Sequence, residues 1–186
     1  MHKLVFRYGT MNSSKTMNLL VMAHNYHQRG KRAFVIQPRV GDRNGVGIVE
    51  SRIGIERKAD LSLTQGQRLD ATSSKWGGVD CVLVDEAQFL TPFQVDDLRR
   101  ITLQAPVICY GLRTDYTSNL FPGSKRLMEL ADRIEEVKTV CAFCTRKTTI
   151  NMKCVDGKAI KSGDAIIDVG REDKYIATCW KCWDER

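Results

Sequence analysis

The stretch RYGTMNSSKT (residues 7–16) decides the fold, because it lies between a short apolar run and a helical pattern. The apolar run, residues 3–8, predicts a buried strand. Residues 16–28 predict a helix, since apolar side chains recur there at positions i, i+3, i+4 and i+7 (Leu19, Met22, Ala23 and Tyr26). Strand, loop and helix in this order are typical of a phosphate-binding loop, whose backbone N–H groups and helix N-terminus face the phosphates.

The loop fits the pattern G-x-x-x-x-G-K-[ST] at Gly9, Lys15 and Thr16, whereas Ser14 stands where the pattern has its second glycine. Serine is the next smallest polar residue, so we expect the loop to function with an altered nucleotide affinity. Lys15 is expected to neutralise the β- and γ-phosphates, and the Thr16 hydroxyl to bind Mg²⁺.

The stretch CVLVDEAQF (residues 81–89) ends an apolar strand in two carboxylates. Asp85 at the strand end suits a Mg²⁺ ion held through water. Glu86 points elsewhere, because neighbouring residues of a strand face opposite sides. A carboxylate beside the γ-phosphate can accept the proton of an attacking hydroxyl, and it can equally polarise water in a simple ATPase.

Further strands are predicted at residues 32–37, 79–86, 106–111 and 133–140, and further helices from Thr91 and over 123–132. Strands that alternate with helices indicate a parallel sheet covered on both faces. Ligands bind beyond the carboxyl ends of such strands, so the loops after residues 8, 37, 85 and 111 should converge on one site. Residues 38–78 show little periodicity and are interpreted as an excursion around a few short elements.

The composition changes at Cys141, where a turn-rich, cysteine-bearing segment begins. We therefore predict two domains, residues 1–140 and residues 141–186. The pairs Cys141/Cys144 and Cys179/Cys182 have the C-x-x-C spacing of zinc knuckles, and together they suit one structural tetrahedral Zn²⁺. A redox C-x-x-C site is the alternative, but it needs only one pair.

The composition fits a cytoplasmic protein with one core and a small appendage: 186 residues, 42% hydrophobic and 27% charged. No apolar run has the length of a membrane helix, and the first residues lack a signal-peptide pattern. The net charge of +7 is spread along the chain without a basic block, which argues against a dedicated nucleic-acid surface.

The motifs GTMNSSKT, DEAQF, GLRTDY, LFPGSK, CAFC, REDKY and CWKC occur in the order and spacing of the zinc-containing (type II) thymidine kinases. The chain resembles this family from residue 4 to about residue 183, and bacterial and large-phage members in particular. The resemblance implies a P-loop (RecA-like) α/β domain followed by a small zinc-ribbon or lasso domain. It also implies transfer of the γ-phosphoryl of ATP to the 5′-hydroxyl of thymidine, with Mg²⁺.

The resemblance assigns residues to each part of this reaction, with Glu86 as the general base. It places ATP against Gly9, Thr10, Met11, Asn12, Ser13, Ser14, Lys15, Thr16, Asp85, Glu86, Ala87 and Gln88. It assigns the phosphates and Mg²⁺ to Thr16, Asp42, Arg43 and Asp85. It surrounds the nucleoside with Met11, Phe89, Leu112, Tyr116, Phe121, Ile166, Ile167, Asp168, Val169, Gly170 and Tyr175. It gives the zinc to Cys141, Cys144, Cys179 and Cys182.

The family is generally tetrameric and inhibited by dTTP, so both properties are expected here. Two other functions remain open from the residues alone. A DNA-stimulated ATPase with a zinc ribbon would respond to single-stranded DNA and not to thymidine. A regulatory nucleotide-binding module would not depend on Glu86.

Overall fold

The computed structural model describes residues 1–39, 47–155, 158–163 and 175–186. Its centre is a six-stranded sheet whose neighbouring strands are all parallel, in the order β5-β2-β6-β7-β1-β8. The strands are β1 (Leu4–Tyr8), β2 (Ala33–Pro38), β5 (Leu61–Leu63), β6 (Cys81–Val84), β7 (Val107–Gly111) and β8 (Arg133–Glu136). The predicted parallel α/β sheet is confirmed.

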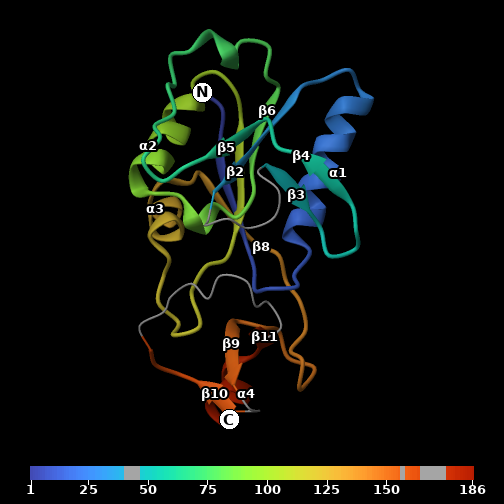
Figure 1. The fold of residues 1–186 in the computed structure, drawn as a ribbon, viewed down its shortest axis with the longest axis vertical. Helices are drawn as coiled ribbons and strands as arrows, with labels where there is room; N and C mark the ends of the chain where they lie inside the picture. Colours follow the sequence, from blue (N-terminus) through green and yellow to red (C-terminus); the bar gives the residue numbers. More distant parts are fainter. Residues whose placement is uncertain (40–46, 156–157, 164–174) are drawn as a thin grey trace.

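Helices cover both faces of this sheet (Figure 1). Helix α1 (Lys15–Gln28) lies on one side, and α2 (Pro92–Ile101) and α3 (Pro122–Leu130) lie on the other. Helix α2 begins at the predicted Thr91 with a capping box, in which the Thr91 hydroxyl accepts from the Gln94 N–H and the Gln94 side chain accepts from the Thr91 N–H. These helices bury the two faces that a parallel sheet must hide from water.

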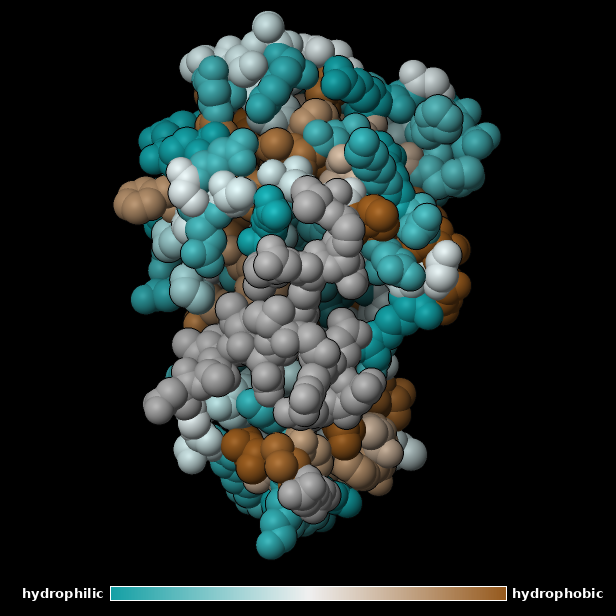
Figure 2. All heavy atoms as spheres, in the orientation of Figure 1, coloured by the Kyte–Doolittle hydropathy of each residue, from teal (hydrophilic) through white to brown (hydrophobic). Residues whose placement is uncertain are grey.

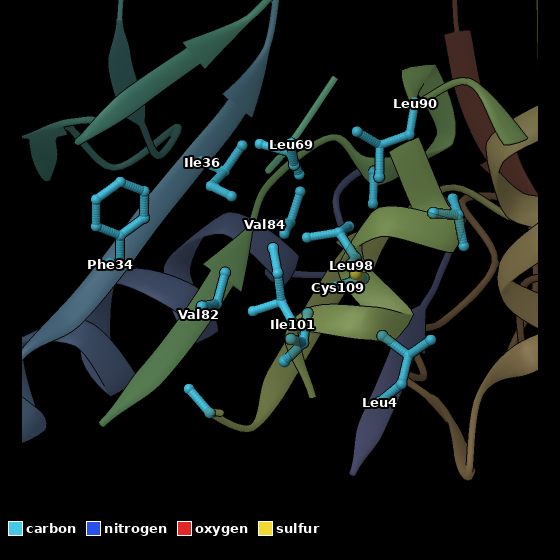
Figure 3. Packing of buried hydrophobic residues seen from close by; sticks show 14 of the residues in the cluster. Leu4, Phe34, Ile36, Leu69, Val82, Val84, Leu90, Leu98, Ile101 and Cys109 are labelled. Atoms are coloured by element: carbon cyan, nitrogen blue, oxygen red, sulfur yellow. The ribbon is translucent and has the colours of Figure 1, made fainter. Parts of the chain in front are cut away.

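The core is divided by the sheet, because successive strand residues face opposite sides. Val82 and Val84 pack with residues of α2 and α3, whereas Cys81 and Leu83 pack with residues of α1. Figure 3 shows the first of these layers, with the side chain of Leu98 from α2 directed toward Val84. Cys81 and Cys109 are fully buried and pack as small core residues.

The described part of the segment between β2 and β6, residues 47–80, contains three short strands and a turn of 3-10 helix, η1 (Ser74–Trp76). Strands β3 (Ile48–Glu50) and β4 (Glu56–Lys58) form an antiparallel hairpin. The sequence predicted short elements in this segment. It did not predict that β5 would become an edge strand of the main sheet, paired with β2.

Three predicted elements end earlier in the structure, and one of them is β6, which ends at Val84 and not at residue 86. Strand β8 ends at Glu136, opposite Tyr8, because its partner β1 ends there and continues as the phosphate loop. Helix α3 ends at Leu130, since Ala131 is extended and the Asp132 carboxylate accepts a hydrogen bond from the Leu4 N–H.

The C-terminal part of the chain forms a second, antiparallel sheet in the order β10-β9-β11, followed by the short helix α4 (Trp180–Asp184). Its strands are β9 (Ile150–Val155), β10 (Lys158–Ile160) and β11 (Tyr175–Thr178). We call residues 141–186, as far as they are described, the C-terminal unit. It lies at the lower end of Figure 1, and the domain boundary near residue 140 stays a prediction.

Hydrophilic residues cover most of the surface seen in Figure 2 outside the grey atoms, and hydrophobic residues gather toward the C-terminal unit. Among the described residues, no helix combines the length and the apolar character that a membrane crossing requires.

Candidate active site

The phosphate loop leads from the end of β1 to the start of α1, as the sequence predicts. Asn12 and Ser14 both have left-handed backbones, with φ values of 63° and 62°. Ser14 therefore adopts the conformation that a glycine takes freely, at a cost of about 1 kcal/mol for a residue with a side chain. At Gly9, an added Cβ would lie 2.4 Å from the Ser13 Oγ and 2.6 Å from the Val137 carbonyl oxygen, so the first glycine is sterically required.

Lys15 is held over this loop. Its Nζ donates to the Thr10 carbonyl at 2.7 Å and to the Ser13 Oγ at 3.3 Å. Burial lowers the pKa of Lys15, and the charges of Glu86 and Asp85 oppose that shift. The charge of Arg52, on the β3–β4 turn, lowers the pKa of Lys15 further. Arg52 is thus a cation near the loop that sequence reasoning missed, because no motif marks it.

Strand β6 brings its terminal carboxylate to the start of α1. The Thr16 Oγ1 donates to the Asp85 carboxylate, whose Oδ1 and Oδ2 lie 3.2 Å and 3.1 Å from it. Asp85 is 4% exposed, and burial together with the Glu86 charge raises its pKa to about 7. A hydroxyl and a carboxylate this close are oxygen ligands of the kind that Mg²⁺ prefers.

Glu86 stands at a sharp turn after β6, with a left-handed φ of 48°. Its carboxylate accepts a hydrogen bond from the Gln88 side-chain amide. Gln88 is 1% exposed, and its Oε1 accepts from the Leu112 N–H at 2.9 Å. Sequence reasoning assigned Gln88 to nucleotide binding and did not predict this bridge between Glu86 and the loop after β7.

Aromatic residues predicted for the nucleoside form two pairs. Phe89 and Phe121 meet edge to face, with ring centroids 5.8 Å apart. Tyr116 and Tyr175 lie with centroids 6.4 Å apart, so a strand of the C-terminal unit reaches the loop after β7. The other predicted members that can be placed are Met11 in the phosphate loop and Leu112 beside Gln88.

Seven predicted residues lie outside the described ranges: Asp42, Arg43, Ile166, Ile167, Asp168, Val169 and Gly170.

The C-terminal unit also contacts the phosphate loop directly. The Thr10 and Thr148 hydroxyls lie 2.8 Å apart, and the Met11 N–H donates to the Asn151 Oδ1 at 2.7 Å. Sequence reasoning missed Thr148 and Asn151, because single polar residues at a strand start form no recognisable motif.

The four paired cysteines converge in the C-terminal unit. Their Sγ atoms all lie within 4.8 Å of one another, so the cluster could hold a metal ion. Burial opposes ionisation of Cys141, but backbone N–H donors outweigh it and lower the pKa of this thiol to about 6. Convergence of both pairs favours a metal site over a redox pair, and four thiolates are a typical zinc ligand set.

Comparison with known proteins agrees with this arrangement. The profile of the family described as "Thymidine kinase" matches residues 2–183. The chain belongs to the thymidine kinase family. It is 43% identical to a thymidine kinase of Streptococcus thermophilus over 185 residues, covering 98% of this chain and 94% of the relative. It is 42% identical to a thymidine kinase of Chromobacterium violaceum, covering 98% of each. A Streptococcus gordonii thymidine kinase is also 42% identical, over 97% of this chain and 95% of the relative.

Proposed function

We propose that this protein is a thymidine kinase that transfers the γ-phosphoryl of ATP to the 5′-hydroxyl of thymidine, giving dTMP and ADP. The observation that carries the proposal is the Thr16–Asp85 contact in a chain of this family. This contact joins the phosphate loop to the strand end that bears Glu86. The contact supports a single site that would contain both Lys15 as phosphate-binding cation and Glu86 as proton acceptor.

The phosphate loop would bind ATP through its backbone N–H groups and the N-terminus of α1. Lys15, now bonded to the Thr10 carbonyl, would turn to the β- and γ-phosphates. Thr16 and Asp85 would hold Mg²⁺, which neutralises developing phosphate charge when bound. Asp42 and Arg43 are proposed to assist at the phosphates by matching position in the family.

Glu86 would accept the proton of the thymidine 5′-hydroxyl. Its backbone is held in a strained turn, and the Gln88 amide fixes one carboxylate oxygen. Positioning of this kind matters because phosphoryl transfer relies on geometry and charge more than on covalent chemistry. The second carboxylate oxygen would then be directed to the substrate.

Thymidine would lie among aromatic residues that follow β6 and β7. Phe89, Phe121 and Tyr116 supply flat apolar surfaces, which suit a pyrimidine ring. The segment between β10 and β11, including residues 166–170, is proposed to cover the base and to exclude water, which limits wasteful hydrolysis of ATP. Met11, Leu112 and Tyr175 complete this proposed binding set.

The metal of the cysteine cluster is proposed to be a structural Zn²⁺ that ties the two ends of this covering segment together. A homotetramer, inhibition by dTTP and a cytoplasmic location are further proposals drawn from the family. Division into an ATP-binding domain, residues 1–140, and a covering domain, residues 141–186, belongs to the same proposal.

An ADP-release assay with each of the four deoxynucleosides, with and without single-stranded DNA, tests the function. The proposal expects thymidine to stimulate ADP release strongly and DNA to have no effect. Stimulation by DNA and not by thymidine would instead identify a DNA-dependent ATPase.

A further inference from the structure

Asn151, near the start of β9, connects three separate parts of the chain. Its Oδ1 accepts from the Met11 N–H at 2.7 Å, and its Nδ2 donates to the Thr114 carbonyl at 3.4 Å. It is 4% exposed, so water does not compete freely for these bonds. One amide thus joins the C-terminal unit to the phosphate loop and to the loop after β7.

The phosphate loop needs such outside contacts, because it contains two left-handed non-glycine residues. Strained backbones persist only where the surroundings over-determine them. Met11 directly precedes the first of these residues, Asn12. Its N–H donates to Asn151 and not to a loop carbonyl, so this bond fixes the backbone where the loop begins its turn.

Thr148 makes a second contact of the same kind. Its hydroxyl donates to the Thr139 carbonyl at 3.2 Å, so the hydrogen bond over the 2.8 Å between Thr10 and Thr148 is donated by Thr10. Both threonines are buried. Two consecutive loop residues, Thr10 and Met11, are therefore anchored to the C-terminal unit.

The segment that carries these anchors is hydrogen-bonded to chain that lies beside the paired cysteines in sequence. The Thr149 N–H donates to the Thr178 carbonyl at 2.8 Å, next to Cys179. On the other side, the Thr148 N–H donates to the Thr139 carbonyl at 3.0 Å, two residues before Cys141. The segments that lead into Cys141 and Cys179 thus also position Thr148 and Asn151.

We propose that Asn151 is a positioning residue for nucleotide binding, supported by Thr148. Asn151 acts through the Met11 N–H and needs no contact with substrate. The C-terminal unit then shapes the ATP side of the site in addition to its proposed cover over the base. This inference rests on the proposed kinase function for its meaning in catalysis.

The test compares Asn151→Ala and Thr148→Val with the control Thr149→Val. Thr149 is the matched control, because its buried hydroxyl has no hydrogen-bond partner among the described residues and Val keeps its shape. ADP affinity is measured by calorimetry with Mg²⁺, alongside zinc content, thermal unfolding, and kcat and KM for ATP and thymidine.

We expect Asn151→Ala to weaken ADP binding about 10- to 100-fold, the usual effect of leaving a buried donor unpaired. Thr148→Val should weaken ADP binding about 5-fold, since the phosphate loop loses the hydrogen bond that Thr10 donates to Thr148. Thr148→Val should also raise the KM for ATP and leave the KM for thymidine unchanged, because Thr148 contacts only the phosphate-loop side. A purely structural role would not separate the two KM values.

Unchanged ADP affinity in folded, zinc-loaded Asn151→Ala and Thr148→Val would overturn the inference, and so would an equal loss in Thr149→Val. If Asn151→Ala does not fold, Thr148→Val decides alone. Failure of the kinase proposal looks different: the unmodified protein would not phosphorylate thymidine, while the variants would still lose ADP affinity relative to it.

Discussion

Glu86→Gln is the sharpest test of the proposed chemistry, because it exchanges a carboxylate for an amide of the same shape. The Glu86 carboxylate accepts a bond from the Gln88 amide, and the side-chain oxygen of a glutamine at this position could accept the same bond. The strained turn and the Leu112 contact of Gln88 should therefore survive. What the variant loses is the ability to take a proton from the 5′-hydroxyl.

Loss of a general base slows turnover by about 10²–10⁴. This factor corresponds to an increase of about 3–5 kcal/mol in the activation free energy. Because Lys15, Thr16 and the loop are untouched, the affinities for ADP and thymidine should stay close to those of the unmodified protein. Turnover would be followed by ADP release and the affinities by calorimetry.

The matched control is Glu56→Gln, which makes the same exchange at an exposed carboxylate on β4 and should leave kcat unchanged. Undiminished turnover in Glu86→Gln would refute the assignment of Glu86. A fall in turnover with an equal loss of ADP affinity would show that Glu86 supports the loop and is not the base.

Three other predictions concern stability and the metal. The pKa of Asp85 is raised from 3.8 to about 7, so the folded state keeps a proton that the unfolded state releases, and stability should fall as pH rises between these values. In urea unfolding without Mg²⁺, the free energy of unfolding should fall by an amount on the order of 3 kcal/mol from pH 5 to pH 8, and this fall should vanish in Asp85→Asn. Equal pH dependence in Asp85→Asn and the unmodified protein would contradict this. Cys182→Ser should lower the bound zinc and raise the KM for thymidine, whereas Cys154→Ser, outside the cluster, should keep both; a zinc-free unmodified protein would rule out the clamp. Ser14→Gly should change the free energy of unfolding little, since relief of the left-handed strain offsets the greater flexibility of glycine, while Ser14→Val should cost about 1–3 kcal/mol by thermal unfolding.

Much of the sheet could be predicted from the sequence, because its inner strands are continuous apolar runs. The run that ends at Asp85 and the cap at Thr91 are local signals, and the structure places β6 and α2 within two residues of the predicted limits at these ends. Strand β5 has only three residues and no surrounding pattern, so its place in the sheet depends on pairing with β2. Such pairing is a tertiary effect that local propensity does not encode.

In the candidate site, too, some contacts could be predicted from the sequence and others could not. The contact between Thr16 and Asp85 could be predicted, because both motifs lie at carboxyl ends of parallel strands. The bridging contacts of Gln88 and Asn151 could not, since each depends on which backbone group of a distant loop comes within reach. Buried amides of this kind are found by asking where each hydrogen-bonding group is satisfied, which requires coordinates.

The position of β1 in the sheet has a consequence for the chain while it is still on the ribosome. This strand is synthesised before both of its neighbours, β7 and β8, whose paired residues lie more than a hundred positions later, within Val107–Gly111 and Arg133–Glu136. At translation rates of about 5–20 residues per second, the apolar residues Leu4 and Phe6 wait roughly 5–25 seconds for their partners to emerge. Until then the apolar side of β1 has no sheet to pack in, and slow translation would lengthen this exposure.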